Sequence, residues 1–225
     1  MSTNFSNNFN TLNEYVKNRI KEFEKLGKSG ETIFNFKPFL DIELKANIKT
    51  ELLFCISTAN SSAVSGIKFQ KALENLDLEK LSEDNIEELM RKAGVRFSSK
   101  KAVYARKALD NFEYVKLAME MEDKEARNLI VKKFKGIGYK EASHFLRNIG
   151  RKNLAIIDRH VIKWLEERGV ETKLKTKLKT KSQTKSLTPK NYERLERVLK
   201  EFAKDISLAE FDLLIWSSIT GKVLK

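Results

Sequence analysis

The stretch Phe134-Lys135-Gly136-Ile137-Gly138-Tyr139-Lys140-Glu141-Ala142 decides the fold of this chain. It places a Gly-x-Gly turn between two amphipathic helical patterns. Glycine reaches backbone conformations that are closed to other residues, so the amide groups of the turn can converge on a phosphate, and the next helix adds its positive dipole. The turn is too short for a Rossmann or P-loop fingerprint, and no strand pattern precedes it. The stretch therefore predicts a helix-hairpin-helix, a motif that holds the duplex backbone without reading sequence.

Helical periodicity dominates the rest of the chain, with capping residues at most of its breaks. The expected helices are one opened by a Thr11–Glu14 capping box, then 48–56, 64–76, 86–93, a long helix from about 98 to 121, 123–134, 159–168, 190–204 and 208–219. Only 32–39 and 154–157 look like strands, and neither shows hairpin turn chemistry with a partner. The sequence therefore predicts an all-α fold.

Positive charge is the first indication of function. The 225 residues carry 44 Lys+Arg and 31 Asp+Glu, a net charge of +13, and the hydrophobic fraction of 41% suffices for a buried core. A strongly basic chain commonly meets polyanions such as nucleic acid, although a lysine-rich soluble surface is the alternative. Residues 172–188 hold six lysines in a four-residue threonine repeat, so +7 remains elsewhere. We expect 170–188 to be a mobile loop, more readily a tolerated insertion than a phosphate-binding arm.

Cysteine, histidine and hydropathy exclude several classes of protein. Cys55 is the only cysteine, so the chain has no intramolecular disulfide and no ligands for a cysteine-bound zinc or iron–sulfur site. His144 and His160 are too few for a histidine-rich metal centre. No apolar run approaches the roughly 18 residues that span a bilayer, and residues 1–30 lack a secretory signal. We expect a soluble intracellular protein of the cytoplasm or nucleoid.

The residues after the turn sharpen the functional prediction. Lys140 opens the second helix, His144 and Arg147 recur on its face, Gly150 ends it, and Asp158 lies eighteen residues after Lys140. This Gly-Ile-Gly-Tyr-Lys-(x)17-Asp pattern resembles the helix-hairpin-helix Gly/Pro-Asp superfamily of base-excision DNA glycosylases. Compact size, the lack of four cysteines and the final Gly-Lys-Val-Leu-Lys resemble its type-2 8-oxoguanine DNA glycosylase/AP lyase branch. The resemblance covers nearly the whole chain except the threonine and lysine repeat.

This resemblance implies an architecture and a partner. Two helical lobes would flank an active-site cleft, one built from 1–52 with 130–225 and the other from 53–129. The implied partner is double-stranded DNA containing 8-oxoguanine, bound by a monomer. No cofactor is implied, although the hairpin admits a structural monovalent cation.

The same resemblance makes Lys140 the nucleophile and Asp158 its electrostatic partner. A glycosylase/lyase attacks sugar C1′ with a neutral amine, expels the base and holds a Schiff base that permits β-elimination. A carboxylate stabilises the cationic sugar as the glycosidic bond breaks. Taken singly, Lys140 also fits a phosphate-binding lysine and Asp158 an ordinary helix N-cap. Their joint spacing with the hairpin favours catalysis.

Base recognition requires residues that hold an extruded nucleotide. Here the resemblance implies roles for His144 and Trp216 at the purine, Phe97 in the pocket or between base pairs, and Asn60 in the duplex beside the orphaned base. Each also has an ordinary structural interpretation, as a buried histidine, a core aromatic or a turn residue. Lys225 is implied in reading 8-oxoguanine, whose N7–H donor would meet an acceptor, through an atom that the sequence does not define.

Two other functions remain open at this stage. A non-catalytic module would use the hairpin, with Gly136 and Gly138 on the DNA backbone, to bind intact and damaged duplexes alike. A glycosylase of the same architecture would excise an oxidised pyrimidine or a mispaired adenine, although many such relatives carry a four-cysteine cluster that this chain cannot build.

Overall fold

Helices dominate the described chain, which confirms the all-α prediction. The computed structural model describes residues 2–172 and 187–225, with side chains described from residue 12 onward. Its helices are α1 (Ser2–Ser29), α2 (Ile48–Thr58), α3 (Ala63–Ala72), α4 (Glu83–Lys92), α5 (Ser98–Asp110), α6 (Glu113–Met119), α7 (Asp123–Lys133), α8 (Tyr139–Asn148), α9 (Arg159–Glu166), α10 (Pro189–Ala203) and α11 (Leu208–Thr220), with a 3-10 turn η1 (Leu78–Lys80). Strands β1 (Glu31–Asn35) and β2 (Glu43–Asn47) complete the fold. The predicted loop 170–188 lies mostly in 173–186, outside the described residues.

Capping residues set most of the helix boundaries near the expected positions. Ser82 begins α4 with a capping box in which its hydroxyl accepts the Asn85 amide, and Thr188 caps α10 with Pro189 in the first turn. Two expectations were wrong. Helix α1 begins at Ser2 rather than at Thr11, and the long helix expected from about 98 to 121 is broken between Asp110 and Glu113 into α5 and α6.

A β-hairpin is present where none was expected. Strands β1 and β2 pair antiparallel, with Phe34 opposite Leu44, and both strands alternate exposed and buried residues. The sequence of β2, Glu-Leu-Lys-Ala-Asn, has low strand propensity, and the connection to it lacks a two-residue turn signal. Burial of one face outweighs that propensity, since β1 packs on α1 and β2 on α2 and α3. The second expected strand, 154–157, is instead an irregular connection.

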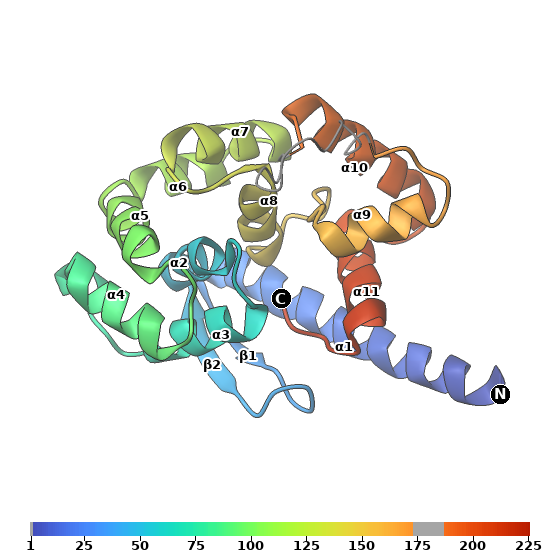
Figure 1. Ribbon diagram of the computed structural model, residues 1–225, viewed down its shortest axis with the longest axis horizontal. Helices are drawn as coiled ribbons and strands as arrows, with labels where there is room; N and C mark the ends of the chain where they lie inside the picture. The colour runs from blue at the N-terminus through green and yellow to red at the C-terminus, as the bar shows by residue number, and fades with distance from the viewer. Residues whose placement is uncertain (1, 173–186) are drawn as a thin grey trace, which may run out of the picture.

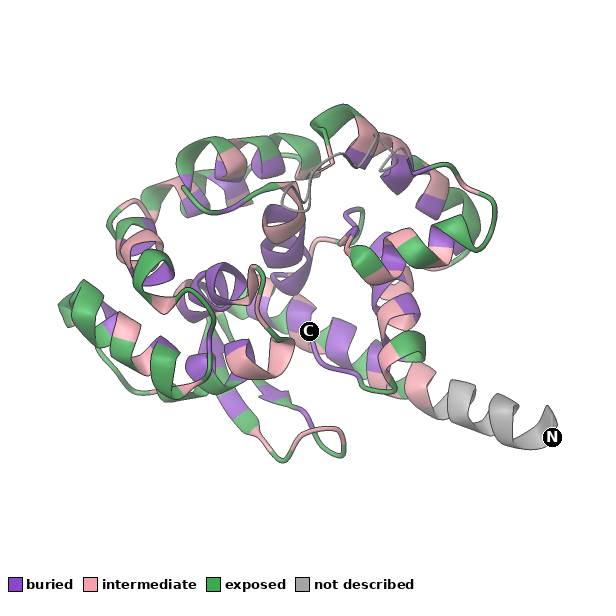
Figure 2. Cartoon of the chain, in the orientation of Figure 1, coloured by how far each residue is buried: buried purple, intermediate pink, exposed green. Residues whose placement is uncertain are grey.

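Helix α8 lies in the middle of the molecule, with α5 to α7 on one side and α9 to α11 on the other (Figure 1). Seven consecutive residues of α8, 142–148, are buried (Figure 2). The helix also passes very close to α1, because a Cβ atom at Gly27 would lie 2.0 Å from the carbonyl oxygen of Ile149. The larger hydrophobic core lies among α1 to α8, and a smaller core packs residues 155–165 against α10 and α11. The expected division into two lobes stays a prediction.

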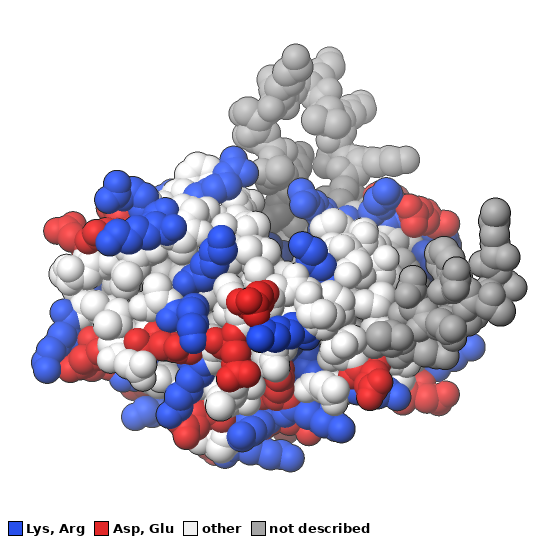
Figure 3. Space-filling model, turned by 90° about the horizontal axis from the view of Figure 1, so that it is seen from below, with Lys and Arg blue, Asp and Glu red and all other residues white. Residues whose placement is uncertain are grey.

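Charged side chains cover the surface without a large region of one sign on the face that Figure 3 shows, where basic and acidic groups alternate. Among the described helices, none is long and apolar enough to cross a membrane.

Candidate active site

The turn between α7 and α8 presents its backbone to solvent. Gly136 has a φ of +90°, a conformation that favours glycine, and a Cβ atom there would lie 2.2 Å from a ring carbon of Tyr104 on α5. The turn therefore sits directly on α5. Gly136 and Gly138 are both exposed, and so is Lys135 between the two helices. Exposed amides beside a lysine at a helix N-terminus form a suitable surface for a phosphate.

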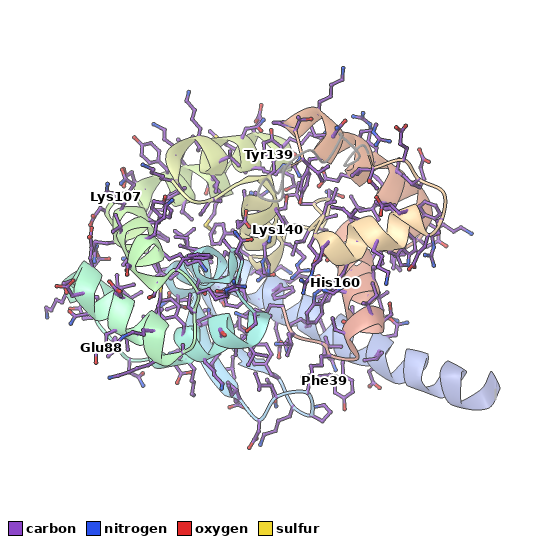
Figure 4. All side chains as sticks on the ribbon, in the orientation of Figure 1. Phe39, Glu88, Lys107, Tyr139, Lys140 and His160 are labelled. Carbon is purple, nitrogen blue, oxygen red and sulfur yellow. The ribbon has the colours of Figure 1, made fainter. Side chains whose placement is uncertain are left out.

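Lys140 is the second residue of α8, and its position is fixed through its neighbour Glu141. The Lys140 amine lies 3.1 Å from Glu141 Oε1, and the other oxygen of this carboxylate accepts the Gly138 amide at 3.3 Å. One carboxylate thus ties the amine to the turn. The Lys140 side chain is 37% exposed, so its amine is accessible from outside. Lys140 lies near the centre of the molecule, on the side that faces α9 (Figure 4).

Asp158 caps the N-terminus of α9. Its Oδ1 accepts the backbone amides of His160 at 2.8 Å and Val161 at 3.0 Å. These two hydrogen bonds hold the carboxylate at the positive end of the helix dipole. Because both capping bonds fall on Oδ1, Oδ2 takes no part in them. Capping α9, which is the alternative role for Asp158 in the sequence, is therefore compatible with stabilising a positive charge.

Lys225 reaches into the interior of the protein through its side chain. The Lys225 amine is 2.7 Å from Glu51 Oε2 on α2, bonds Gln70 Oε1 on α3, and lies 4.1 Å from the ring centres of Phe34 and Phe54. Burial lowers the pKa of this amine, and the Glu51 carboxylate opposes the shift. The side chain is fully buried. Lys225 therefore holds its own main chain against the centre of the molecule, near the C label in Figure 1.

His144 and Trp216 occupy different surroundings. His144 is only 8% exposed and meets the Phe54 ring edge-on at 5.4 Å. Burial lowers the pKa of its imidazole well below 6.5, and the positive charges of Arg147 and Lys140 add to this effect, so His144 is neutral. Among the described residues its Nε2 atom has no hydrogen-bond partner. Trp216 is half-buried and packs edge-on against His160, two residues beyond Asp158, at 6.5 Å.

Asn60 and Phe97 lie on two loops that are bonded together. Both are exposed, Phe97 at 62%, and both have a left-handed φ, 54° and 60°. Ser61 Oγ accepts the Arg96 amide at 2.7 Å, which joins the two loops. The left-handed conformation is common for an asparagine in a turn and uncommon for a phenylalanine.

Buried Lys101 links these loops to the surroundings of Lys140. Its amine donates to the Ser57 carbonyl at 2.7 Å and to Ser61 Oγ at 3.1 Å. The pKa of Lys101 is lowered to about 8, chiefly by burial, with the Glu141 carboxylate opposing the shift and the charge of Lys140 contributing to it. Lys101 therefore lies within electrostatic reach of Lys140.

The comparisons with known proteins agree with this geometry. The family model described as "8-oxoguanine DNA glycosylase" matches residues 16–208. The chain belongs to the 8-oxoguanine DNA glycosylase family. The resemblance found in the hairpin and its spacing to Asp158 is thereby confirmed, and so is the expectation of a DNA-repair enzyme. Relatives in this family match nearly the full chain.

Two curated relatives are named 8-oxoguanine DNA glycosylase/AP lyase. That of Aquifex aeolicus is 44% identical over 95% of this chain and 94% of its own length, and that of Methanocaldococcus jannaschii is 36% identical over 95% and 93%. The 8-oxoguanine glycosylase/lyase of M. jannaschii, solved with a 15mer DNA containing 8-oxoguanine, superposes with a TM-score of 0.75 at 32% identity, covering 94% of this chain and 92% of that one. The 8-oxoguanine DNA glycosylase of Thermotoga maritima gives 0.76 at 32%, covering 93% and 91%.

Sequence reasoning missed several residues that organise this family site. Glu141 lies three residues after the second glycine and could have been found as a capping-box partner. Lys101, Glu51 and Gln70 lie on separate helices, and their contacts cross 40, 174 and 155 residues of sequence. No local pattern points to such pairs.

Proposed function

We propose that this chain excises 8-oxoguanine from double-stranded DNA and cleaves the strand, with Lys140 as nucleophile and Asp158 as its electrostatic partner. The observation that carries the proposal is the placement of Lys140 and Asp158 at the starts of α8 and α9, behind a turn with exposed glycine amides, in a chain of this family. The protein acts as a monomer, where DNA lies, in the cytoplasm or nucleoid.

The reaction begins with binding and base extrusion. The exposed turn of Gly136 and Gly138 holds a backbone phosphate, which takes the Gly138 amide in place of Glu141 Oε2, and Phe97 and Asn60 enter the duplex from their paired loops. Exposure of Phe97 favours contact between base pairs over a place in the base pocket. His144 and Trp216 form apolar walls for the flipped purine.

Excision then requires a neutral Lys140 amine. The amine attacks C1′ of the deoxyribose and forms the C–N bond, and the bond from C1′ to the base nitrogen breaks with its electron pair leaving on the base. Asp158 stabilises the positive charge on the sugar during this step. The attached nitrogen then loses one proton, the C1′–O4′ bond breaks and O4′ takes up a proton, which gives a protonated Schiff base. The Schiff base makes the C2′ proton acidic, and its removal breaks the C3′–O bond and expels the 3′ phosphate by β-elimination.

Base discrimination falls to a backbone oxygen of Lys225. The Lys225 amine is bound to Glu51 and Gln70, so it does not meet the base. A backbone oxygen can accept the N7–H donor that 8-oxoguanine has and guanine lacks. We expect no cofactor in this chemistry, and the turn admits a structural monovalent cation.

Borohydride trapping tests nucleophile and substrate together. Duplexes carrying one 8-oxoguanine, guanine or thymine glycol would be incubated with the wild type, Lys140→Gln, and Lys107→Gln as a matched control at an exposed site on α5. We expect a covalent adduct with 8-oxoguanine alone, retained in Lys107→Gln and lost in Lys140→Gln with DNA binding intact. An adduct in Lys140→Gln refutes the nucleophile, and an adduct with thymine glycol alone refutes the role of Lys225.

A further inference from the structure

The connection that leads to Asp158 is held by side chains rather than by secondary structure. Residues 154–158 form neither helix nor strand, and Ala155 and Ile157 are buried. Buried amides without partners are costly, so the three consecutive amides of this connection need acceptors from elsewhere.

Three buried side chains of α10 and α11 supply these acceptors. Glu196 Oε1 accepts the amide of Ala155 at 3.0 Å, Asp212 Oδ2 accepts that of Ile156 at 2.5 Å, and the Tyr192 hydroxyl accepts that of Ile157 at 3.0 Å. The Tyr192 hydroxyl also donates to the Ala155 carbonyl at 2.8 Å, so one oxygen bridges both ends of the connection.

The acceptors are themselves fixed by buried ion pairs with α7 and α8. Arg127 binds both oxygens of Glu196, at 2.8 and 3.1 Å, and Arg147 binds Asp212 Oδ1 at 2.6 Å. Arg147 belongs to α8, the helix that carries Lys140. Burial raises the pKa of Asp212 to about 6, and the charge of Asp158 adds to this shift, so the two carboxylates lie within electrostatic reach of each other.

We propose that Tyr192, supported by Glu196 and Asp212, is a positioning residue that sets the location of Asp158 relative to Lys140. Tyr192 touches neither DNA nor sugar in this scheme and acts through the backbone of 155–157. The inference rests on the proposed role of Asp158. A displacement of about 1 Å of a catalytic group can cost about 100-fold in rate, so the bonds of one hydroxyl are sufficient for a large effect.

Tyr192→Phe is the sharpest test because it removes the hydroxyl and keeps the buried ring. Tyr15→Phe is the matched control, since its ring packs on Phe39 of another region. We expect the single-turnover excision rate of Tyr192→Phe to fall about 10- to 100-fold. Its Kd for a duplex with a tetrahydrofuran abasic analogue should stay within about threefold of the wild type, and Tyr15→Phe should match the wild type in both. An unchanged excision rate in Tyr192→Phe overturns the proposal, and so does a rate loss that a weaker Kd fully explains.

A double-mutant cycle separates positioning from a general loss of structure. If Tyr192 acts through Asp158, adding Tyr192→Phe to Asp158→Asn should lower the residual rate by less than about threefold. Full additivity of the two losses would overturn the inference. Wild-type activity in Asp158→Asn would instead refute the proposed role of Asp158, and no excision by the wild-type protein would refute the proposed function, so these failures are distinguishable.

A second variant covers the case in which Tyr192→Phe does not fold. Asp212→Asn keeps an acceptor for either Ile156 or Arg147 but not for both, and it should lower the single-turnover rate with the abasic-site Kd retained. Hydrogen exchange of peptide 153–158 should speed up in this variant while α1 is unchanged. Unaltered exchange together with an unaltered rate would refute the positioning role.

Discussion

Replacing Glu51 with glutamine tests how much the stability of the protein depends on one buried carboxylate. Glu51 is completely buried and accepts from three side chains: Oε2 binds Lys225 and Gln70, and Oε1 binds Asn148 at 2.7 Å. Glutamine has almost the same shape but only one acceptor oxygen. If that oxygen keeps the bond to Asn148, the new amide group points its hydrogens at the Lys225 ammonium, where an anion stood 2.7 Å away.

The expected loss of stability is large for a substitution that removes no volume. Breaking a buried ion pair by removing one partner costs about 3–5 kcal/mol, because it leaves the other charge buried without compensation. Gln70 and the two phenylalanine rings remain near Lys225 and place the loss toward the lower end of that range. For a chain of this length each kcal/mol lowers Tm by about 2–4 °C, so Glu51→Gln should lower Tm by about 6–12 °C.

Thermal and urea unfolding of four proteins checks this value: the wild type, Glu51→Gln, Lys225→Met and the double variant. The double variant removes both charges, so its stability should lie closer to the wild type than that of either single variant. A loss below about 1 kcal/mol in Glu51→Gln would refute the reasoning, since the pair would then contribute no more than an exposed one. Simple additivity of the two single losses would refute it as well.

Three other changes probe separate parts of the fold. Gly136→Ala should lower the free energy of unfolding, measured in urea, by about 2–4 kcal/mol. Gly30 has a similar positive φ and no atom within 4 Å of an added Cβ atom, so Gly30→Ala should lower it by only about 1 kcal/mol. Equal losses would rule out close packing at the turn. The depressed pKa of His144 means that below pH 6.5 the unfolded chain takes up a proton that the folded protein refuses, so stability falls with falling pH, by up to about 1.4 kcal/mol per unit. His144→Gln should remove this contribution, measured as the difference between the slopes of wild type and variant in urea unfolding between pH 5 and 7, and equal slopes would contradict the assignment. Lys101→Met leaves the Ser57 carbonyl without its donor and should lower the free energy of unfolding by about 1–3 kcal/mol. A loss near zero in the same urea assay would contradict this prediction.

Local chemistry explains why the hairpin and the places of Lys140 and Asp158 at the starts of two helices were predictable, while their catalytic roles stay predictions. A few adjacent residues determine each of these features: the Gly-x-Gly turn, the start of the helix at Lys140 and the cap by Asp158. The hairpin of β1 and β2 was not predictable in this way, because its second strand owes its conformation to burial of Leu44 and Ala46 in the core. Tertiary packing overrode the weak local preference.

The surroundings of the site depend on contacts that no short pattern encodes. Tyr192 and Asp212 look in the sequence like ordinary members of amphipathic helices, and only the folded chain brings them to the connection before Asp158. Lys101 likewise resembles any surface lysine until the structure buries it among the loops at 57–61. Roles for Lys225, Trp216 and Asn60 came from family resemblance and stay predictions.

The bond between Lys225 and Glu51 has a consequence for the order of folding. It closes a span of 174 residues, and Asn148 reaches the same carboxylate across 97. Contacts of such separation carry a high loop-closure entropy and form after local helices and turns. In refolding experiments the Lys225–Glu51 bond should therefore form late, after the helices and the turn between α7 and α8. The side chain that closes the centre of the molecule is thus the last to be secured when the chain folds.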